Sequence, residues 1–148
     1  MKTYFKISLT LLISLMISCS GDDNSNSEDN ISNQILQGQV FGNDFTALGG
    51  KAFDSGEDIS VNITNIAADC ESSVLDYDLE ISTYVTPEVG VYEGINVVFN
   101  KDGEAPLNYL DSIVEVTSLT DTEITVKIKA VSSSENTIEG IFTVPYCK

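Results

Sequence analysis

From residue 35 onward, apolar and polar side chains alternate with a period of two, and turn residues interrupt the alternation at short intervals. Ile59, Val61 and Ile63, for example, alternate with polar neighbours, and no stretch keeps the three-to-four spacing of an amphipathic helix. A period of two places successive side chains on opposite faces of a strand. The pattern therefore predicts an all-β domain.

Turn residues divide this region into individual strands. Residues 42–44 contain glycine, asparagine and aspartate, so they predict a short hairpin between 37–41 and 45–48. We expect a strand over 59–64, followed by a loop over 65–73 in which the alternation is lost.

A further strand is expected over 75–83, with Tyr77 on its apolar side and Asp76, Asp78 and Glu80 on its solvent side. Pro87 and Gly90 lie in the turn that ends this strand, and Asp102 and Gly103 form another turn further on.

The last part of the chain predicts its own strand register. If residues 120–122 form a turn, Glu115 lies opposite Lys127, and a second turn after the next strand places Lys129 opposite Glu139. The same register faces the aliphatic positions as Val114 with Ile128, Val116 with Val126, Ile128 with Gly140 and Val126 with Phe142. Opposite charges on one face and apolar pairs on the other favour a three-stranded antiparallel meander.

Residues 35–148 have the length of a single domain with its own core. Uneven strand lengths and loops favour two packed sheets, so we predict an antiparallel β-sandwich that ends in the meander. A closed β-barrel is the alternative.

The start of the chain has the composition of an export signal. Lys2 and Lys6 precede an apolar stretch over 7–17, and a small serine comes immediately before Cys19. The apolar stretch is only about half as long as a bilayer-spanning helix. We therefore expect residues 1–18 to be a cleaved signal peptide.

The run from Leu15 to Cys19 resembles the lipobox of bacterial lipoproteins, in which the cysteine becomes the acylated N-terminus after cleavage. This chain has Met16 where leucine is usual, three residues before the cysteine. The resemblance implies that fatty acids on Cys19 hold the protein on a membrane, since each buried methylene contributes about 0.8 kcal/mol. The alternative is an ordinary signal with an incidental cysteine.

Residues 20–30 have no apolar side chain and an excess of acids, so residues 19–34 are expected to be the acylated N-terminus and a disordered acidic tether. Such starts resemble those of Bacteroidetes lipoproteins, in which acids near the lipidated cysteine go with export to the outer face of the outer membrane. The resemblance implies a lipid-anchored outer-membrane protein, on the cell surface rather than the periplasmic face.

Three short motifs of the β-rich body also resemble small lipoproteins of Bacteroidetes, a group without an established activity. The residues that carry this resemblance are Gly38 and Val40, then Pro87, Gly90 and Tyr92, and finally Ile138, Gly140 and Phe142 before Cys147. The resemblance implies a shared fold.

The charge of the chain limits its partners. It has 23 acidic residues, seven lysines and no arginine, with a formal net charge of −16. Removal of residues 1–18 takes away two lysines and no acid, which leaves about −18. Nucleic acid is thereby excluded as a partner, and anionic lipid headgroups are disfavoured for the folded part.

Two cysteines remain after the candidate anchor. Cys70 and Cys147 form an even pair in a chain with an export signal, and an oxidising compartment favours a disulfide between them. Two separate buried thiols are the alternative.

The chain contains no histidine, so histidine-based acid–base catalysis, Ser-His-Asp and Cys-His nucleophiles and common zinc sites are excluded. We predict no catalytic residue, no cofactor and no metal. Calcium remains an alternative at residues 54–58 or at Asp76, Asp78 and Glu80, although the second run lacks the glycine of a calcium loop.

Binding is the remaining class of function. Tyr84, Tyr92 and Tyr109 near strand ends are candidates either for glycan stacking or for packing, and 111–113 resembles an acceptor for O-linked glycans on Ser112 in Bacteroidetes proteins. We therefore predict a lipid-anchored envelope protein that acts as a non-catalytic binding or interaction module for a protein or glycan. A carboxylate-based hydrolase and a structural subunit of an outer-membrane complex are the alternatives.

Overall fold

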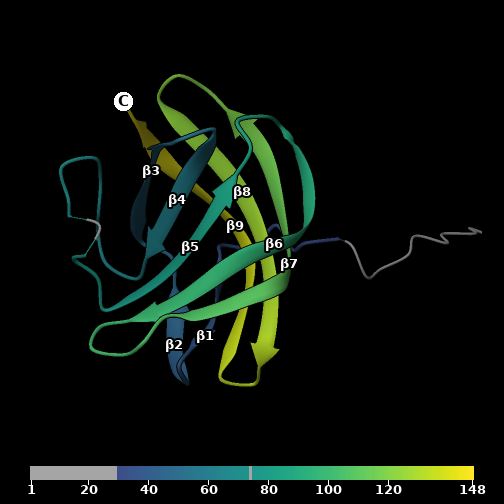
Figure 1. Ribbon diagram of the computed structural model, residues 1–148. Helices are drawn as coiled ribbons and strands as arrows, with labels where there is room; N and C mark the ends of the chain where they lie inside the picture. The colour runs from purple at the N-terminus through teal and green to yellow at the C-terminus, as the bar shows by residue number, and fades with distance from the viewer. Residues whose placement is uncertain (1–29, 74) are drawn as a thin grey trace, which may run out of the picture.

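A computed structural model describes residues 30–73 and 75–148 (Figure 1). This part of the chain forms nine strands and no helix, so none of it forms a helix able to span a membrane. The strands are β1 (Gln37–Val40), β2 (Asn43–Thr46), β3 (Gly49–Ser55), β4 (Asp58–Thr64), β5 (Leu79–Val85), β6 (Gly90–Lys101), β7 (Leu107–Leu119), β8 (Glu123–Ser133) and β9 (Asn136–Cys147).

Strands β3 to β9 form a closed barrel of seven strands. Each strand pairs antiparallel with the next, and β9 closes the barrel by running parallel to β3, with Tyr146 beside Ala52 and Cys147 beside Phe53. The prediction of an all-β domain is confirmed, but the β-sandwich is wrong and the alternative of a barrel is the better match.

The long strand β6 gives the physical reason for closure. Its register with β7 shifts between Glu93 and Ile95 and again between Ile95 and Val97, and such bulges bend a strand and increase its twist. The curled sheet then brings β9 back to β3. Alternation of side chains is the same in a sandwich and in a barrel, so it could not distinguish them.

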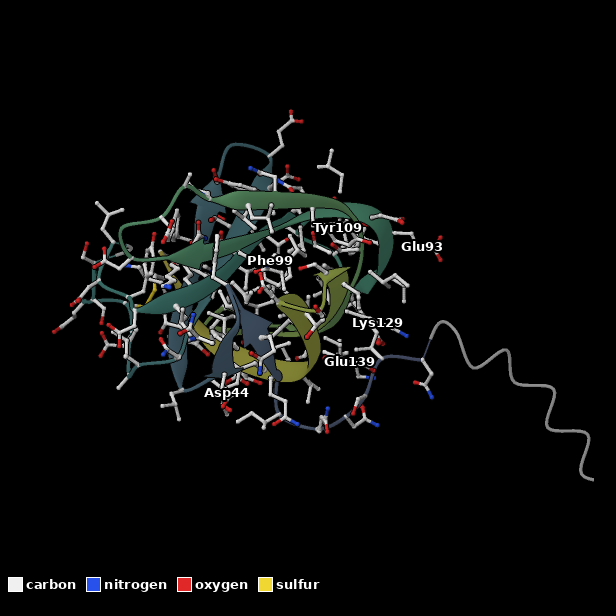
Figure 2. All side chains as sticks on the ribbon, turned by 90° about the horizontal axis from the view of Figure 1, so that it is seen from below. Asp44, Glu93, Phe99, Tyr109, Lys129 and Glu139 are labelled. Carbon is white, nitrogen blue, oxygen red and sulfur yellow. A yellow bond between two sulfur atoms is a disulfide. The ribbon has the colours of Figure 1, made fainter. Side chains whose placement is uncertain are left out.

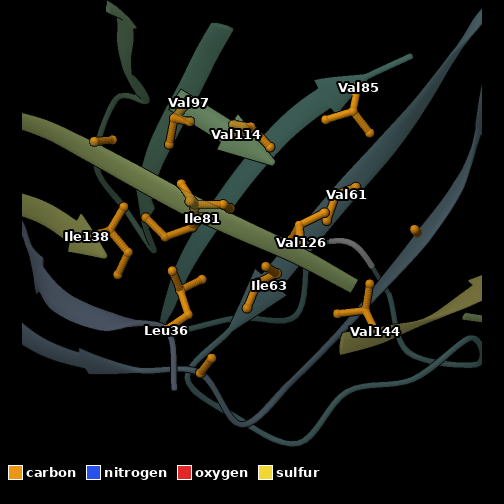
Figure 3. Packing of buried hydrophobic residues seen from close by; sticks show 14 of the residues in the cluster. Leu36, Val61, Ile63, Ile81, Val85, Val97, Val114, Val126, Ile138 and Val144 are labelled. Atoms are coloured by element: carbon orange, nitrogen blue, oxygen red, sulfur yellow. The ribbon is translucent and has the colours of Figure 1, made fainter. Parts of the chain in front are cut away.

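The barrel interior is filled by the alternating apolar side chains. Leu36, Val61, Ile81, Val126 and Val144 come from different parts of the chain and meet there (Figure 3). All five are at most 1% exposed, so the barrel has a packed core.

The predicted meander is confirmed in β7, β8 and β9. Glu115 pairs with Lys127, and Lys129 pairs with Glu139. Nζ of Lys127 lies 3.3 Å from Oε2 of Glu115, and Figure 2 shows Lys129 and Glu139 near each other. The aliphatic pairs also have the expected register.

The two remaining strands, β1 and β2, form the expected hairpin at one end of the barrel (Figure 1). The turn consists of Phe41 and Gly42, both with positive φ, rather than of residues 42–44. β1 pairs with β9, and Val40 and Phe45 point into the core. The hairpin therefore closes one mouth of the barrel.

The segment before β1 crosses β9 at Gly140. The backbone N–H of Ile141 donates to the carbonyl of Gln34 (2.8 Å), and that of Leu36 donates to the carbonyl of Ile141 (3.0 Å). Ile31 is buried, and the backbone N–H of Ser32 donates to Oε1 of Glu139 (3.0 Å). Residues 31–34, expected at the end of the tether, thus contact the barrel.

Candidate functional site

The predicted disulfide between Cys70 and Cys147 is present, with the Cα atoms 5.5 Å apart. It joins the loop between β4 and β5 to the end of β9. Nζ of Lys51 on β3 donates to the carbonyl of Ser72, and the backbone N–H of Gly50 donates to that of Ala68 (3.1 Å). The loop is therefore held against the outside of the barrel.

Glu80 is buried close to this loop, which corrects the expectation that it faces solvent. Strand β5 begins only at Leu79, and Leu75 is 80% exposed, so the strand predicted over 75–83 is about half loop. Glu80 is only 5% exposed, and Oε1 accepts a hydrogen bond from Nδ2 of Asn100 (3.0 Å). Burial raises the pKa of Glu80 to about 7, although the bond from Asn100 opposes the rise.

A small cavity of about 10 Å³ lies between the loop and the sheet, with room for a single water molecule. Its lining residues are Gly50, Lys51, Asn62, Thr64, Ala68, Ser72, Ser73 and Glu80. This volume is too small for an organic ligand. We therefore interpret Glu80 and the residues around this cavity as a structural feature of the barrel surface under the loop.

Replacement of Glu80 with glutamine is expected to remove a pH dependence of stability. The folded domain binds the Glu80 proton more tightly than the unfolded chain, in which the pKa has its ordinary value of 4.5. This contribution is complete below about pH 4.5 and is lost as pH rises through 7, on the order of 3 kcal/mol in total. Urea unfolding of the wild type and of Glu80→Gln from pH 4.5 to 8 measures it. Parallel stability curves for the two proteins would contradict the assignment.

A much larger cleft lies at the end of the barrel, between the β1–β2 hairpin and the adjoining ends of β4, β5 and β6. Its volume is about 410 Å³. Its lining residues are Asn43, Asp44, Asn65, Asp78, Leu79, Lys101 and Asp102. We call this feature the end cleft.

Backbone contacts fix the wall of the end cleft. The backbone N–H of Leu79 donates to Oδ1 of Asn65 (2.9 Å), and that of Asp102 donates to the carbonyl of Asp78 (3.0 Å). Asp44, Asp78 and Asp102 are exposed. Three carboxylates and one lysine therefore line a solvent-exposed cleft with an excess of negative charge.

A second depression of about 510 Å³ lies on the outer side of the hairpin and shares Asp44 with the end cleft. The other lining residues are Gln34, Gln37, Gly38, Phe45 and Thr46. Figure 2 views the barrel from this end and shows Asp44 pointing away from the interior, where Phe99 lies. Strand β2 is thus accessible from two sides.

The acids considered for calcium do not come together. Residues 54–58 comprise the turn between β3 and β4 and the strand ends on either side of it, and Asp54 accepts a hydrogen bond from the hydroxyl of Tyr146. Asp76 and Asp78 lie in the loop, while Glu80 is buried in β5. Within residues 30–73 and 75–148, no three His, Cys, Asp or Glu side chains are placed to hold a metal ion.

The candidate binding residues are also separated from one another. Tyr84 is exposed, whereas Tyr92 donates its hydroxyl to the carbonyl of Glu88 (2.8 Å) and, like Tyr109, packs against the core. Ser112 is 1% exposed and donates its hydroxyl to the carbonyl of Tyr109 (3.3 Å). A glycan acceptor at Ser112 is therefore inaccessible in the folded domain.

The candidate lipidation site Cys19, the signal peptide over 1–18 and most of the tether over 19–34 lie outside the described residues. The sequence does not predict the end cleft, because its pattern indicates only turns at Asn43, Asp44 and Asp102. Their spacing in the chain carries no signal that they meet.

Comparison of the chain with models of protein families, with curated proteins and with solved structures gives no match.

Proposed function

We propose that this protein is a non-catalytic binding module of the cell envelope, anchored through Cys19, and that the end cleft binds its ligand. The observation that carries the proposal is the end cleft itself. Its volume of about 410 Å³ lies within the usual range for ligand sites, and mouths of β-barrels are among their preferred places.

The chemistry of the end cleft supports binding rather than catalysis. A carboxyl group that acts as a general acid needs shielding from water, whereas Asp44, Asp78 and Asp102 are exposed. The buried carboxyl group, Glu80, is not among the residues that line the end cleft. The chain also has no histidine. Carboxylate, amide and lysine side chains suit polar recognition.

The charge of the protein supports a ligand with positive charge. The chain has a formal net charge of −16, and three of the residues that line the end cleft are acids against a single lysine. Such a field attracts cationic partners and repels nucleic acid and anionic lipid. A basic segment of a protein fits this surface better than a neutral glycan.

Placement at the outer membrane, on the cell surface, follows from the proposed lipid on Cys19 and the acids after it. Replacement of Cys19 with serine is expected to move the protein from the membrane fraction to the soluble envelope fraction, because no acyl chain remains. Fractionation with immunoblotting measures this, and mass spectrometry of the native N-terminus identifies the lipid. An unmodified sulfur at Cys19 would contradict the anchor.

The ligand can be sought by chemical crosslinking and pull-down from solubilised outer membranes with the full-length protein. The wild type is expected to capture a partner that the double variant Asp78→Asn/Asp102→Asn loses, because that variant keeps the shape of the end cleft and removes two charges. Asp121→Asn, on an exposed turn remote from the end cleft in sequence, is the matched control. Equal capture by all three proteins would count against the end cleft.

A further inference from the structure

We infer that the free edge of β2 binds an extended, basic peptide segment of a partner protein, which adds to the sheet as a further strand within the end cleft. This inference rests on the proposed binding function and names the chemistry of the partner. Its main observation is independent of charge, since it comes from the backbone of the hairpin.

The register of the hairpin determines which backbone groups of β2 point away from β1. Phe41 and Gly42 form a two-residue turn, so Val40 and Asn43 are the hydrogen-bonded pair that closes it. Bonded and non-bonded pairs alternate along an antiparallel ladder. The N–H and C=O groups of Asp44 therefore point outward, and those of Thr46 follow the same alternation.

Two backbone contacts agree with this alternation. The N–H of Ala47 donates to the carbonyl of Leu36 (2.9 Å), which continues the inward row beyond β2. The N–H of Leu48, the next outward group, donates to the carbonyl of Thr64 (2.9 Å). The outward row is thus already paired with another segment at Leu48.

Strand β2 is the terminal strand of the sheet, and β1 is its sole partner strand among the described residues. The outward backbone groups of Asp44 and Thr46 therefore lie on an open edge. Both residues are exposed, and both of the large depressions at this end of the barrel include β2 residues. Space and unpaired backbone groups coincide there, which is the arrangement that strand addition requires.

The negative charge around the β2 edge favours a positively charged peptide. Asp44 lies on the edge itself, and Asp78 and Asp102 line the cleft beside it. A second copy of this chain would bring another Asp44 to the same edge, and it would also carry a formal net charge of −16. The repulsion between the two copies opposes self-association. A strand with lysine or arginine side chains would instead place its positive charges next to these acids.

The edge is short, since β2 has four residues. Only the backbone groups of Asp44 and Thr46 are available, so the peptide is bound by a few main-chain hydrogen bonds together with charge attraction. Such binding is weak and declines as the salt concentration rises. An anchored protein suits a weak site, because a second attachment to the same membrane raises the effective concentration of its partner.

The probe is a synthetic heptapeptide of alternating lysine and valine with blocked ends, titrated into the full chain carrying Cys19→Ser. Its control is the same peptide with every backbone nitrogen methylated, which keeps the charges and loses the N–H donors. We expect the methylated peptide to bind about tenfold more weakly. Equal affinity of the two peptides would overturn strand addition and leave an electrostatic site in the end cleft.

The protein offers a matched pair of variants. Thr46→Pro removes the outward N–H. No hydrogen bond to β1 is lost, because this N–H points away from β1, and proline is tolerated where a strand edge faces solvent. Thr46→Ala keeps that N–H. We expect Thr46→Pro to weaken binding of the unmethylated peptide about tenfold and Thr46→Ala to leave it within about twofold. Equal effects of the two substitutions would contradict the inference.

Circular dichroism of Thr46→Pro shows whether the domain remains folded, and the methylated peptide tests the inference without any substitution. If neither peptide binds while the pull-down recovers a partner that requires Asp78 and Asp102, strand addition is wrong and the binding function stands. If the peptide binds and Asp78→Asn/Asp102→Asn leaves its affinity unchanged, the acidic part of the inference is wrong.

Discussion

Replacement of Gly140 with alanine is expected to destabilise the domain by about 3 kcal/mol or more. A Cβ atom at Gly140 would lie 2.6 Å from the carbonyl oxygen of Ile35 and 2.7 Å from that of Gln34. The residue also has a φ of +141°, a conformation that side-chain-bearing residues rarely adopt. The close approach arises because the segment before β1 crosses β9 at this point.

Gly56→Ala is the matched control for this substitution. Gly56 also has a positive φ, of +70°, but a Cβ atom there meets nothing within 4 Å. We expect the control to cost about 1 kcal/mol, so the difference between the two variants measures the close approach at Gly140. Urea unfolding at constant pH determines both values. If Gly140→Ala cost no more than Gly56→Ala, the crossing of the chain over β9 would be misplaced.

Loss of the disulfide is the second large effect. Cys70 and Cys147 are 77 positions apart, and a crosslink that closes a loop of this length stabilises a protein by about 4 kcal/mol in the chain-entropy model. We expect the double variant Cys70→Ser/Cys147→Ser to lower Tm by roughly 10–20 °C. The contribution comes mainly through the unfolded chain, which explores many more conformations without the crosslink.

Differential scanning calorimetry of the wild type, with and without a reducing agent, and of the double variant provides the measurement. The reduced wild type and the double variant are expected to have similar Tm values, since both lack the crosslink. Unchanged Tm after confirmed reduction would show that the crosslink contributes little.

The sequence predicted local pairing well because the information lay in neighbouring strands. Lys127 and Lys129 each fit opposite an acid in one register of β7, β8 and β9, and a slip by one residue would turn every side chain to the other face. The disulfide was predictable for a different reason, since Cys70 and Cys147 are the two cysteines that remain after the candidate anchor.

Features that depend on distant contacts could not be predicted. Closure of the barrel rests on β9 reaching β3, and alternation along a strand does not reveal which strand lies beside it. Glu80 has the spacing of a solvent-facing residue, yet it is buried on the outer face of the barrel near a loop that crosses that face. The end cleft combines residues from the hairpin with the ends of three other strands.

Strand β9 has three neighbours, since it pairs with β8 along its length, with β1 near its start and with β3 near its end. The last strand of the described chain therefore pairs directly with the first strand, β1, and it closes the barrel against β3. It also supplies Cys147. A ribosome that has not yet released residues 136–147 carries a chain with an open sheet and no crosslink. Closure of the barrel therefore has to wait until β9 has been synthesised, and such long-range pairing is intrinsically slow.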